Sequence, residues 1–275
     1  MNDMNINYYY PSWGMEYMTL EEFLKMVKSS GFDGIEIALD PDKDDLHRVW
    51  KLVKAYELEL LVQHPFSKGN TPEELLNDYS CKLEKLMDLQ PLMINCHTGK
   101  DYYPVAVNLE FIQRAKTLSE KHGIPVAHEI HRGRFSFCTA LIGNYLAPFP
   151  ELLLTADFSH WCVVSESLLE DQQATMDMVI PHCVHIHARV GYAQGPQVSH
   201  PEDPAFAREL DAHLQWWKKI LACHQQRGSM PLTITCEFGP PPYLHTLPFS
   251  NAPVASQHEI NMSMRKYLTE NLILC

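Results

Sequence analysis

The chain has 275 residues, 45% of them hydrophobic, and a formal net charge of −12. This composition excludes a disordered chain, and the negative charge without any run of Lys or Arg argues against a nucleic-acid partner, because phosphate would be repelled. The first residues lack the pattern of a signal peptide and no apolar stretch could span a bilayer, so we expect a cytoplasmic protein without a membrane partner.

Short apolar runs rich in Val, Ile, Leu and Thr predict eight strands. They cover residues 4–9, 34–39, 58–63, 92–97, 124–129, 152–157, 183–189 and 232–237. Helical patterns lie between most of them, at residues 20–30, 45–57, 72–89, 107–123, 168–181 and 209–228. This alternation predicts an α/β fold with one closed (β/α)₈ TIM barrel. An open doubly wound sheet is the alternative, but no G-x-G-x-x-G motif follows the first strand.

No Gly/Ser-rich linker divides the chain, so we expect a single barrel domain over residues 1–275. Its last part, about residues 244–275, is expected to form a helical and extended tail that covers the barrel or joins a subunit interface. Barrels of this kind often pair through their outer helices, so a homo-oligomer is also expected. The eight cysteines are scattered without a C-x-x-C pair, which favours reduced thiols over disulfides.

A carboxylate or an imidazole stands at the end of each of the last four predicted strands. These residues are Glu129, Asp157, His187 and Glu237. In a parallel barrel the carboxyl ends of all strands meet at one face, where the four side chains would converge. Two Glu, one Asp and one His form a site for one divalent metal ion, and these oxygen and nitrogen ligands suit Mn²⁺, Mg²⁺, Zn²⁺ or Co²⁺.

Five short motifs, in a fixed order, make the chain similar to the xylose isomerase-like TIM-barrel superfamily. They are GFDGIEIAL, HEIHR, DFSHW, HIHAR and CEFG, and they extend over nearly the whole chain. The superfamily includes ketose 3-epimerases, hydroxypyruvate isomerase, inosose dehydratase and the endonuclease IV group. The resemblance implies that Glu129, Asp157, His187 and Glu237 bind a single metal ion in this chain.

The resemblance also implies roles for neighbouring residues. The spacing D-x-x-H matches Asp157 and His160, and it implies that His160 lies in the pocket wall and binds substrate. The ligand histidine of the family is usually the second of an H-x-H pair, which selects His187 over His185. Arg189 follows on the same side and is expected to bind an anionic or enolate oxygen of the substrate.

The same residue types suit proton transfer beside a carbonyl group. A metal ion that chelates the carbonyl and a neighbouring hydroxyl stabilises an enediolate, while two carboxylates move the proton. The resemblance implies that Glu129 and Glu237 are these catalytic carboxylates. We therefore predict a metal-dependent isomerase or epimerase that acts on a small carbohydrate, a sugar or a sugar phosphate.

Further residues are expected to surround the site. Those expected to line the substrate pocket are His64, His97, Tyr10 and Trp13. Glu36 lies within the second predicted strand, where a buried carboxylate needs a partner. We expect Glu36 and His185 to support the metal ligands from behind.

Two departures from the epimerase pattern leave other functions open. Phe135 stands six residues after Glu129, where the epimerases have a second carboxylate, and the loop after the seventh strand is long. A lyase that dehydrates a keto-cyclitol or a sugar acid is therefore an alternative, and a barrel that only binds a sugar or a metal is a less favoured one. A DNA-repair nuclease of the endonuclease IV type is disfavoured, because its Asp-x-His pair after the seventh strand is missing and the net charge is negative.

Overall fold

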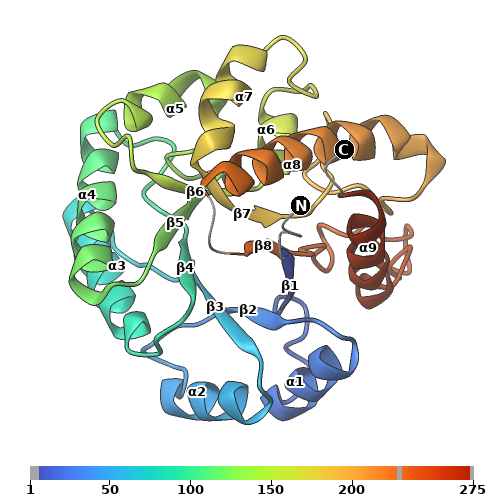
Figure 1. Ribbon diagram of the computed structural model, residues 1–275, viewed down its shortest axis with the longest axis horizontal. Coiled ribbons are helices and arrows are strands. Elements are labelled where there is room, and N and C mark those ends of the chain that lie inside the picture. The colour runs from blue at the N-terminus through green and yellow to red at the C-terminus, as the bar shows by residue number, and fades with distance from the viewer. Residues whose placement is uncertain (1–5, 228–230, 273–275) are drawn as a thin grey trace.

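Within residues 6–227 and 231–272, which the computed structural model describes, eight parallel strands close into a barrel (Figure 1). The strands are β1 (Ile6–Pro11), β2 (Gly34–Ala38), β3 (Glu59–His64), β4 (Met93–Cys96), β5 (Val126–Glu129), β6 (Leu153–Ala156), β7 (Cys183–His187) and β8 (Leu232–Thr235). They pair in sequence order, and β8 closes on β1. The predicted TIM barrel is confirmed. Residues 4 and 5 of the first predicted strand lie outside the described residues.

Helices surround the barrel, and several begin or end at signals visible in the sequence (Figure 1). They are α1 (Leu20–Ser29), α2 (Leu46–Ala55), α3 (Pro72–Met87), α4 (Val105–His122), α5 (Thr139–Leu146), α6 (Phe158–Val164), α7 (Gln173–Val179), α8 (Ala207–Arg227) and α9 (Gln257–Asn271), with 3-10 turns η1 (Ile180–His182) and η2 (Pro204–Phe206). Thr19 and Thr71 form capping boxes at the start of α1 and α3. Gly123 ends α4 in a left-handed conformation, with φ of 68°.

The segment between β5 and β7 departs from the prediction. It contains α5 and α6, which have 8 and 7 residues and no counterpart among the predicted helices. Helices this short contain too few turns for a periodic apolar pattern. The helix predicted over residues 168–181 begins only at Gln173, because Leu169 takes a left-handed conformation with φ of 58°.

Side chains that point into the barrel change from apolar to polar along the strands. Tyr9, Leu61, Met93 and Ala127 form an apolar cluster inside. Two residues further along three of these strands, the inward positions hold Gln63, Asn95 and Glu129, because side chains on one face of a strand recur every second residue. The outer faces of the strands pack against the helices in a larger apolar core. The polar end of the barrel is therefore its carboxyl end, where the strands stop.

The segment after β8 ends in α9, which lies beside α8 in the ring of helices (Figure 1). The apolar side of α9 is buried through Ile260, Met264 and Leu268. Asn261 Oδ1 accepts a hydrogen bond from the Phe238 backbone N–H at 2.9 Å, which attaches the helix to the chain just beyond β8. The final helix is thus part of the layer of helices that packs around the barrel. None of the described helices is long and apolar enough to cross a membrane.

Candidate metal centre

Four polar side chains meet at the carboxyl end of the barrel. Glu129 ends β5, Asp157 follows β6, His187 ends β7 and Glu237 lies two residues beyond β8. Each offers a ligand atom, and these atoms all lie within 4.8 Å of one another. Ligands about 2 Å from one ion are separated by at most about 4 Å, so small side-chain shifts would suffice. The structure therefore brings together the four residues that the sequence singled out.

The two ring nitrogens of His187 face different groups. Its Nε2 lies 3.1 Å from both carboxylate oxygens of Glu36. Its Nδ1 lies 2.8 Å from Glu237 Oε2 and 3.8 Å from Glu129 Oε2, without making a hydrogen bond. If Nε2 carries the proton that Glu36 accepts, the lone pair of Nδ1 is left for a metal ion.

Glu36 is buried inside the barrel and contacts several polar side chains. Thr235 Oγ1 donates a hydrogen bond to it, and His185 Nε2 lies 3.2 Å away. Burial raises the pKa of Glu36, but His187 and His185 outweigh burial and lower it well below its ordinary value. The carboxylate therefore stays ionised and contacts both His187 and His185. Support of the metal ligands by Glu36 and His185 stays a prediction.

The charges of the cluster suit a divalent cation. Burial raises the pKa of Asp157 to about 6, and Arg189 opposes this shift while Glu237 and Glu129 add to it. Burial would lower the pKa of His187, yet the surrounding carboxylates, led by Glu237, raise it well above its ordinary value. Three carboxylates so close together favour any added positive charge, and His187 Nδ1 is a buried nitrogen without a hydrogen bond. This donor set fits a divalent metal ion.

Arg189 and His160 lie together beside Asp157. Arg189 Nη2 donates to Asp157, and Arg189 Nη1 lies 3.6 Å from Glu237 Oε2. His160 Nε2 lies 3.0 Å from Arg189 Nη2, and its ring is fully buried. Arg189 lines the cavity described below, whereas His160 lies behind it. His160 is not among the side chains that line the cavity, and its contact with substrate stays a prediction.

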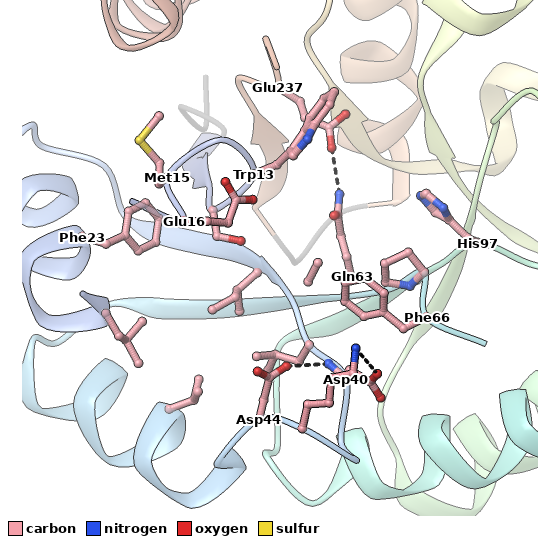
Figure 2. Close-up of a pocket in the computed structure, with 18 of the residues that line it drawn as sticks. Trp13, Met15, Glu16, Phe23, Asp40, Asp44, Gln63, Phe66, His97 and Glu237 are labelled. Carbon is pink, nitrogen blue, oxygen red and sulfur yellow. Dashed lines mark hydrogen bonds and ion pairs between the residues drawn. The ribbon is translucent and has the colours of Figure 1, made fainter. Parts of the chain in front are cut away.

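A cavity of about 720 Å³ opens next to the cluster (Figure 2). Its polar end is lined by Gln63, His97, Glu129, His131, Arg189 and Glu237, with Trp13 and Tyr243 as aromatic walls. Gln63 Nε2 donates to Glu237 Oε1 at 2.8 Å, as Figure 2 shows. His97 Nε2 lies 3.0 Å from Glu129 Oε2. Both carboxylates therefore face the cavity, each held by a neighbouring side chain.

Two residues expected to line the pocket lie elsewhere. His64 points out of the barrel: its Nε2 lies 3.1 Å from the Tyr79 carbonyl oxygen, and its ring stacks on that of Tyr79 in α3. Tyr10 is fully buried between Phe23 and Phe32. Strand alternation explains both corrections, because Gln63 and Tyr9 occupy the inward positions beside them. Trp13 and His97 do line the cavity.

Three residues of the site are absent from the sequence prediction. Gln63 and Asn95 hold Glu237 and Glu129, respectively, and Asn95 Nδ2 donates to Glu129 Oε2 at 2.8 Å. The alternation of β3 and β4 would have identified them once their register was known. Tyr243 comes from the irregular segment after β8, and its ring lies 4.9 Å from the Arg189 guanidinium carbon. No local pattern marks that residue.

Comparison with known proteins supports the fold. No protein-family model matches the chain, and no curated protein matches its sequence. Among solved structures, a D-allulose 3-epimerase from Methylomonas sp. in complex with D-allulose is 16% identical, with a TM-score of 0.63 and 98% of both chains covered. A xylose isomerase-like TIM-barrel protein from Mycobacterium smegmatis in complex with magnesium is 12% identical, with a TM-score of 0.65 and the same coverage.

A third similar structure is the probable 3-DHS dehydratase of Bacillus anthracis. It is 15% identical, has a TM-score of 0.61, and the match covers 96% of this chain and 99% of that one. The protein is thus a barrel of the xylose isomerase-like fold with a buried His/Glu/Asp cluster that could bind a metal ion. Structural similarity at such low sequence identity establishes the fold alone, so the reaction has to be inferred from the residues of the site.

Proposed function

We propose that the protein is a divalent-metal-dependent isomerase or epimerase that transfers a proton at the carbon beside the carbonyl group of a sugar or sugar phosphate. The observation that carries the proposal is the convergence of Glu129, Asp157, His187 and Glu237, two of which, Glu129 and Glu237, line a cavity. A similar structure contains a bound ketose and another contains magnesium, which supports this choice of substrate and cofactor.

The two catalytic residues of the proposal are Glu129 and Glu237. Both line the cavity, and each has one carboxylate oxygen held by a neighbour: His97 and Asn95 hold Glu129 Oε2, and Gln63 holds Glu237 Oε1. Bound at the cluster, a divalent ion would supply Lewis acidity that makes the carbon-bound proton more acidic.

Proton transfer then follows from the placement of the carboxylates. One of them takes the proton from carbon, leaving an enediolate, and a proton is returned to the same or the neighbouring carbon. Arg189 lines the cavity and presents a positive charge that stabilises the negative oxygen as it develops. Trp13 and Tyr243 offer flat apolar faces to a ring or chain.

The first test measures metal content and exchange of carbon-bound hydrogen. We expect one equivalent of divalent metal per chain, and metal-dependent incorporation of deuterium from D₂O into a member of a panel of ketoses, their phosphates and keto-cyclitols. Glu237→Gln should reduce exchange by about 10²–10⁴-fold, the usual contribution of a general base. Glu21→Gln, on the exposed side of α1, is the matched control. Metal binding without exchange on any panel member would contradict the proposal.

A dehydratase is the second candidate, and Phe135 is the observation that favours it. Where the epimerases carry a second carboxylate, this side chain is apolar, 1% exposed and packed on Tyr145. The same proton abstraction followed by loss of a β-hydroxyl would release water and form an enone. Ultraviolet absorbance of the product distinguishes the two reactions, because an epimer does not absorb as an enone does.

A further inference from the structure

The cavity continues well beyond the metal centre into an apolar region. We name this region the apolar annex, and it is formed by the segment after β1, the end of β2 and the facing sides of α1 and α2. Its side chains are Met15, Met18, Leu20, Phe23, Ile37, Leu39 and Val49. In Figure 2, Met15 and Phe23 lie on the opposite side of the cavity from His97. The annex and the metal centre thus form two chemically different ends of one space.

The annex is poorly suited to the hydroxyl groups of a free sugar. Apart from the weakly accepting sulfurs of Met15 and Met18, its side chains offer no hydrogen-bonding group, so a hydroxyl buried there would lack a good partner. The carboxylates at its edge already have partners: Glu16 accepts from the Gly14 N–H at 3.1 Å, Asp44 accepts from the Asp40 N–H at 2.7 Å, and Asp40 lies 3.1 Å from Lys82 Nζ. Asp40 Oδ2 is buried without a hydrogen bond and lies 3.8 Å from Lys43 Nζ; Lys43 and Ser12 line the cavity as well, outside the annex.

The size of the cavity and the exposed side chain at its wall indicate a ligand larger than a free sugar. A volume of about 720 Å³ lies within the range of pockets that hold drug-sized molecules, about 300–1,000 Å³. Phe66, which also lines the cavity, is 40% exposed. Figure 2 shows its ring beside Gln63, so Phe66 adds an apolar side chain to the cavity wall near the polar end.

We propose that the apolar annex binds an aliphatic or aromatic substituent of the substrate. The substrate is then an amphiphile, with a hydroxycarbonyl head at the metal centre and an apolar tail between α1 and α2. The head group rests on the proposed function, whereas the tail rests on the annex alone. Burial of each methylene group would contribute about 0.8 kcal/mol to binding, which is about a three- to four-fold gain in affinity.

The test uses 1-hydroxy-2-alkanones of increasing chain length, from hydroxyacetone to hydroxydecanone, titrated calorimetrically into the Mg²⁺-loaded protein. We expect Kd to fall by about three- to four-fold for each methylene group that enters the annex. Met18→Trp, which fills the annex from a partly exposed loop position, should flatten this dependence on chain length. Met262→Trp, at a partly exposed position of α9 outside the cavity, is the control and should keep it. Phe66→Ala, at an exposed position, should weaken binding of the longer ligands most. It removes a side chain, so unlike Met18→Trp it does not require the fold to accommodate a larger one.

Deuterium exchange on the panel of ketoses, their phosphates and keto-cyclitols, measured separately in wild-type protein, distinguishes this inference from the proposed function. If exchange is observed but the affinity for the alkanones does not change with chain length, the annex proposal is overturned and the proposed function stands. A strong dependence of affinity on chain length, together with no exchange on any panel member, would overturn the function and leave the annex. A dependence that survives both Met18→Trp and Phe66→Ala would place the tail elsewhere and also overturn the inference.

Discussion

His187 is the residue on which the candidate centre depends, because its two nitrogens serve different partners. Glu36 lies on the Nε2 side, and Glu129, Asp157 and Glu237 lie on the Nδ1 side. A metal-binding histidine needs one nitrogen free of protons, and a hydrogen bond at the other nitrogen decides which one it is. Glu36 would therefore influence a metal ion bound at the cluster through His187, without contacting it.

The substitution Glu36→Gln tests this positioning role. The amide keeps the shape of the side chain but accepts hydrogen bonds at only one terminal atom and donates them at the other, so the Nε2–H form of His187 loses its preference. We expect the affinity for Mn²⁺ to fall by about 10–100-fold, measured by titration calorimetry, with an unchanged circular dichroism spectrum. The exposed Glu21→Gln serves as the control. Equal affinities of Glu36→Gln and wild-type protein would contradict the role.

Residues at strand ends were predictable as a set, but the direction of each side chain was not. The four residues of the cluster stand where apolar runs stop, and that signal is local. His64 also ends a strand, yet a shift of one residue decides whether Gln63 or His64 points inward. Because these strands are buried on both faces, their sequences carry no alternation that fixes the direction.

At the scale of elements, a buried lysine connects α3 to the loops beside the apolar annex. Lys82 Nζ lies 3.1 Å from Asp40 and 3.4 Å from Asp78, and it donates to the Phe66 carbonyl oxygen at 2.9 Å. Its side chain is only 2% exposed. These contacts join the loops after β2 and β3, which form one wall of the cavity, to α3, a helix that the sequence predicted over residues 72–89.

Removal of this lysine should destabilise the fold. Lys82→Met keeps the length of the apolar stem but leaves the buried Asp40 with only the exposed Lys43, 3.8 Å away, as a countercharge. Loss of one partner of a buried ion pair costs about 3–5 kcal/mol. Asp42 and Asp78, the other carboxylates that pair with Lys82, are partly exposed and stay solvated without it. We therefore expect the free energy of unfolding to fall by about 3 kcal/mol, the lower end of that range, measured by urea denaturation. Lys116→Met, which removes a half-exposed surface pair, should cost less than about 1 kcal/mol. Similar losses for the two variants would show that Lys82 does not hold these loops.

At the scale of the whole molecule, the barrel is joined to its helices partly through buried neutral histidines. His64 lies between β3 and α3, and His213 of α8 accepts a hydrogen bond from the Gly191 N–H after β7 at 3.2 Å. Burial lowers the pKa of each to about 4. A position on a helix suggests a solvated side chain for His213, but the loop after β7 covers it, a long-range contact that no local sequence pattern reveals.

These histidines make the stability of the fold depend on pH between about 6.5 and 4. Above pH 6.5 both are neutral in the folded and unfolded chain, so they exert no effect; as the pH falls, the unfolded chain takes up protons that the folded chain cannot, and folding weakens. A shift from 6.5 to about 4 corresponds to a loss of about 3 kcal/mol per histidine.

His64→Phe keeps a ring against Tyr79 without a titrating group, so its unfolding free energy should fall less steeply over this range. Urea denaturation at pH 7.5, 6 and 5, with a chelator present for both proteins, measures the difference. Parallel pH profiles would mean that His64 takes up its proton equally well in the folded state.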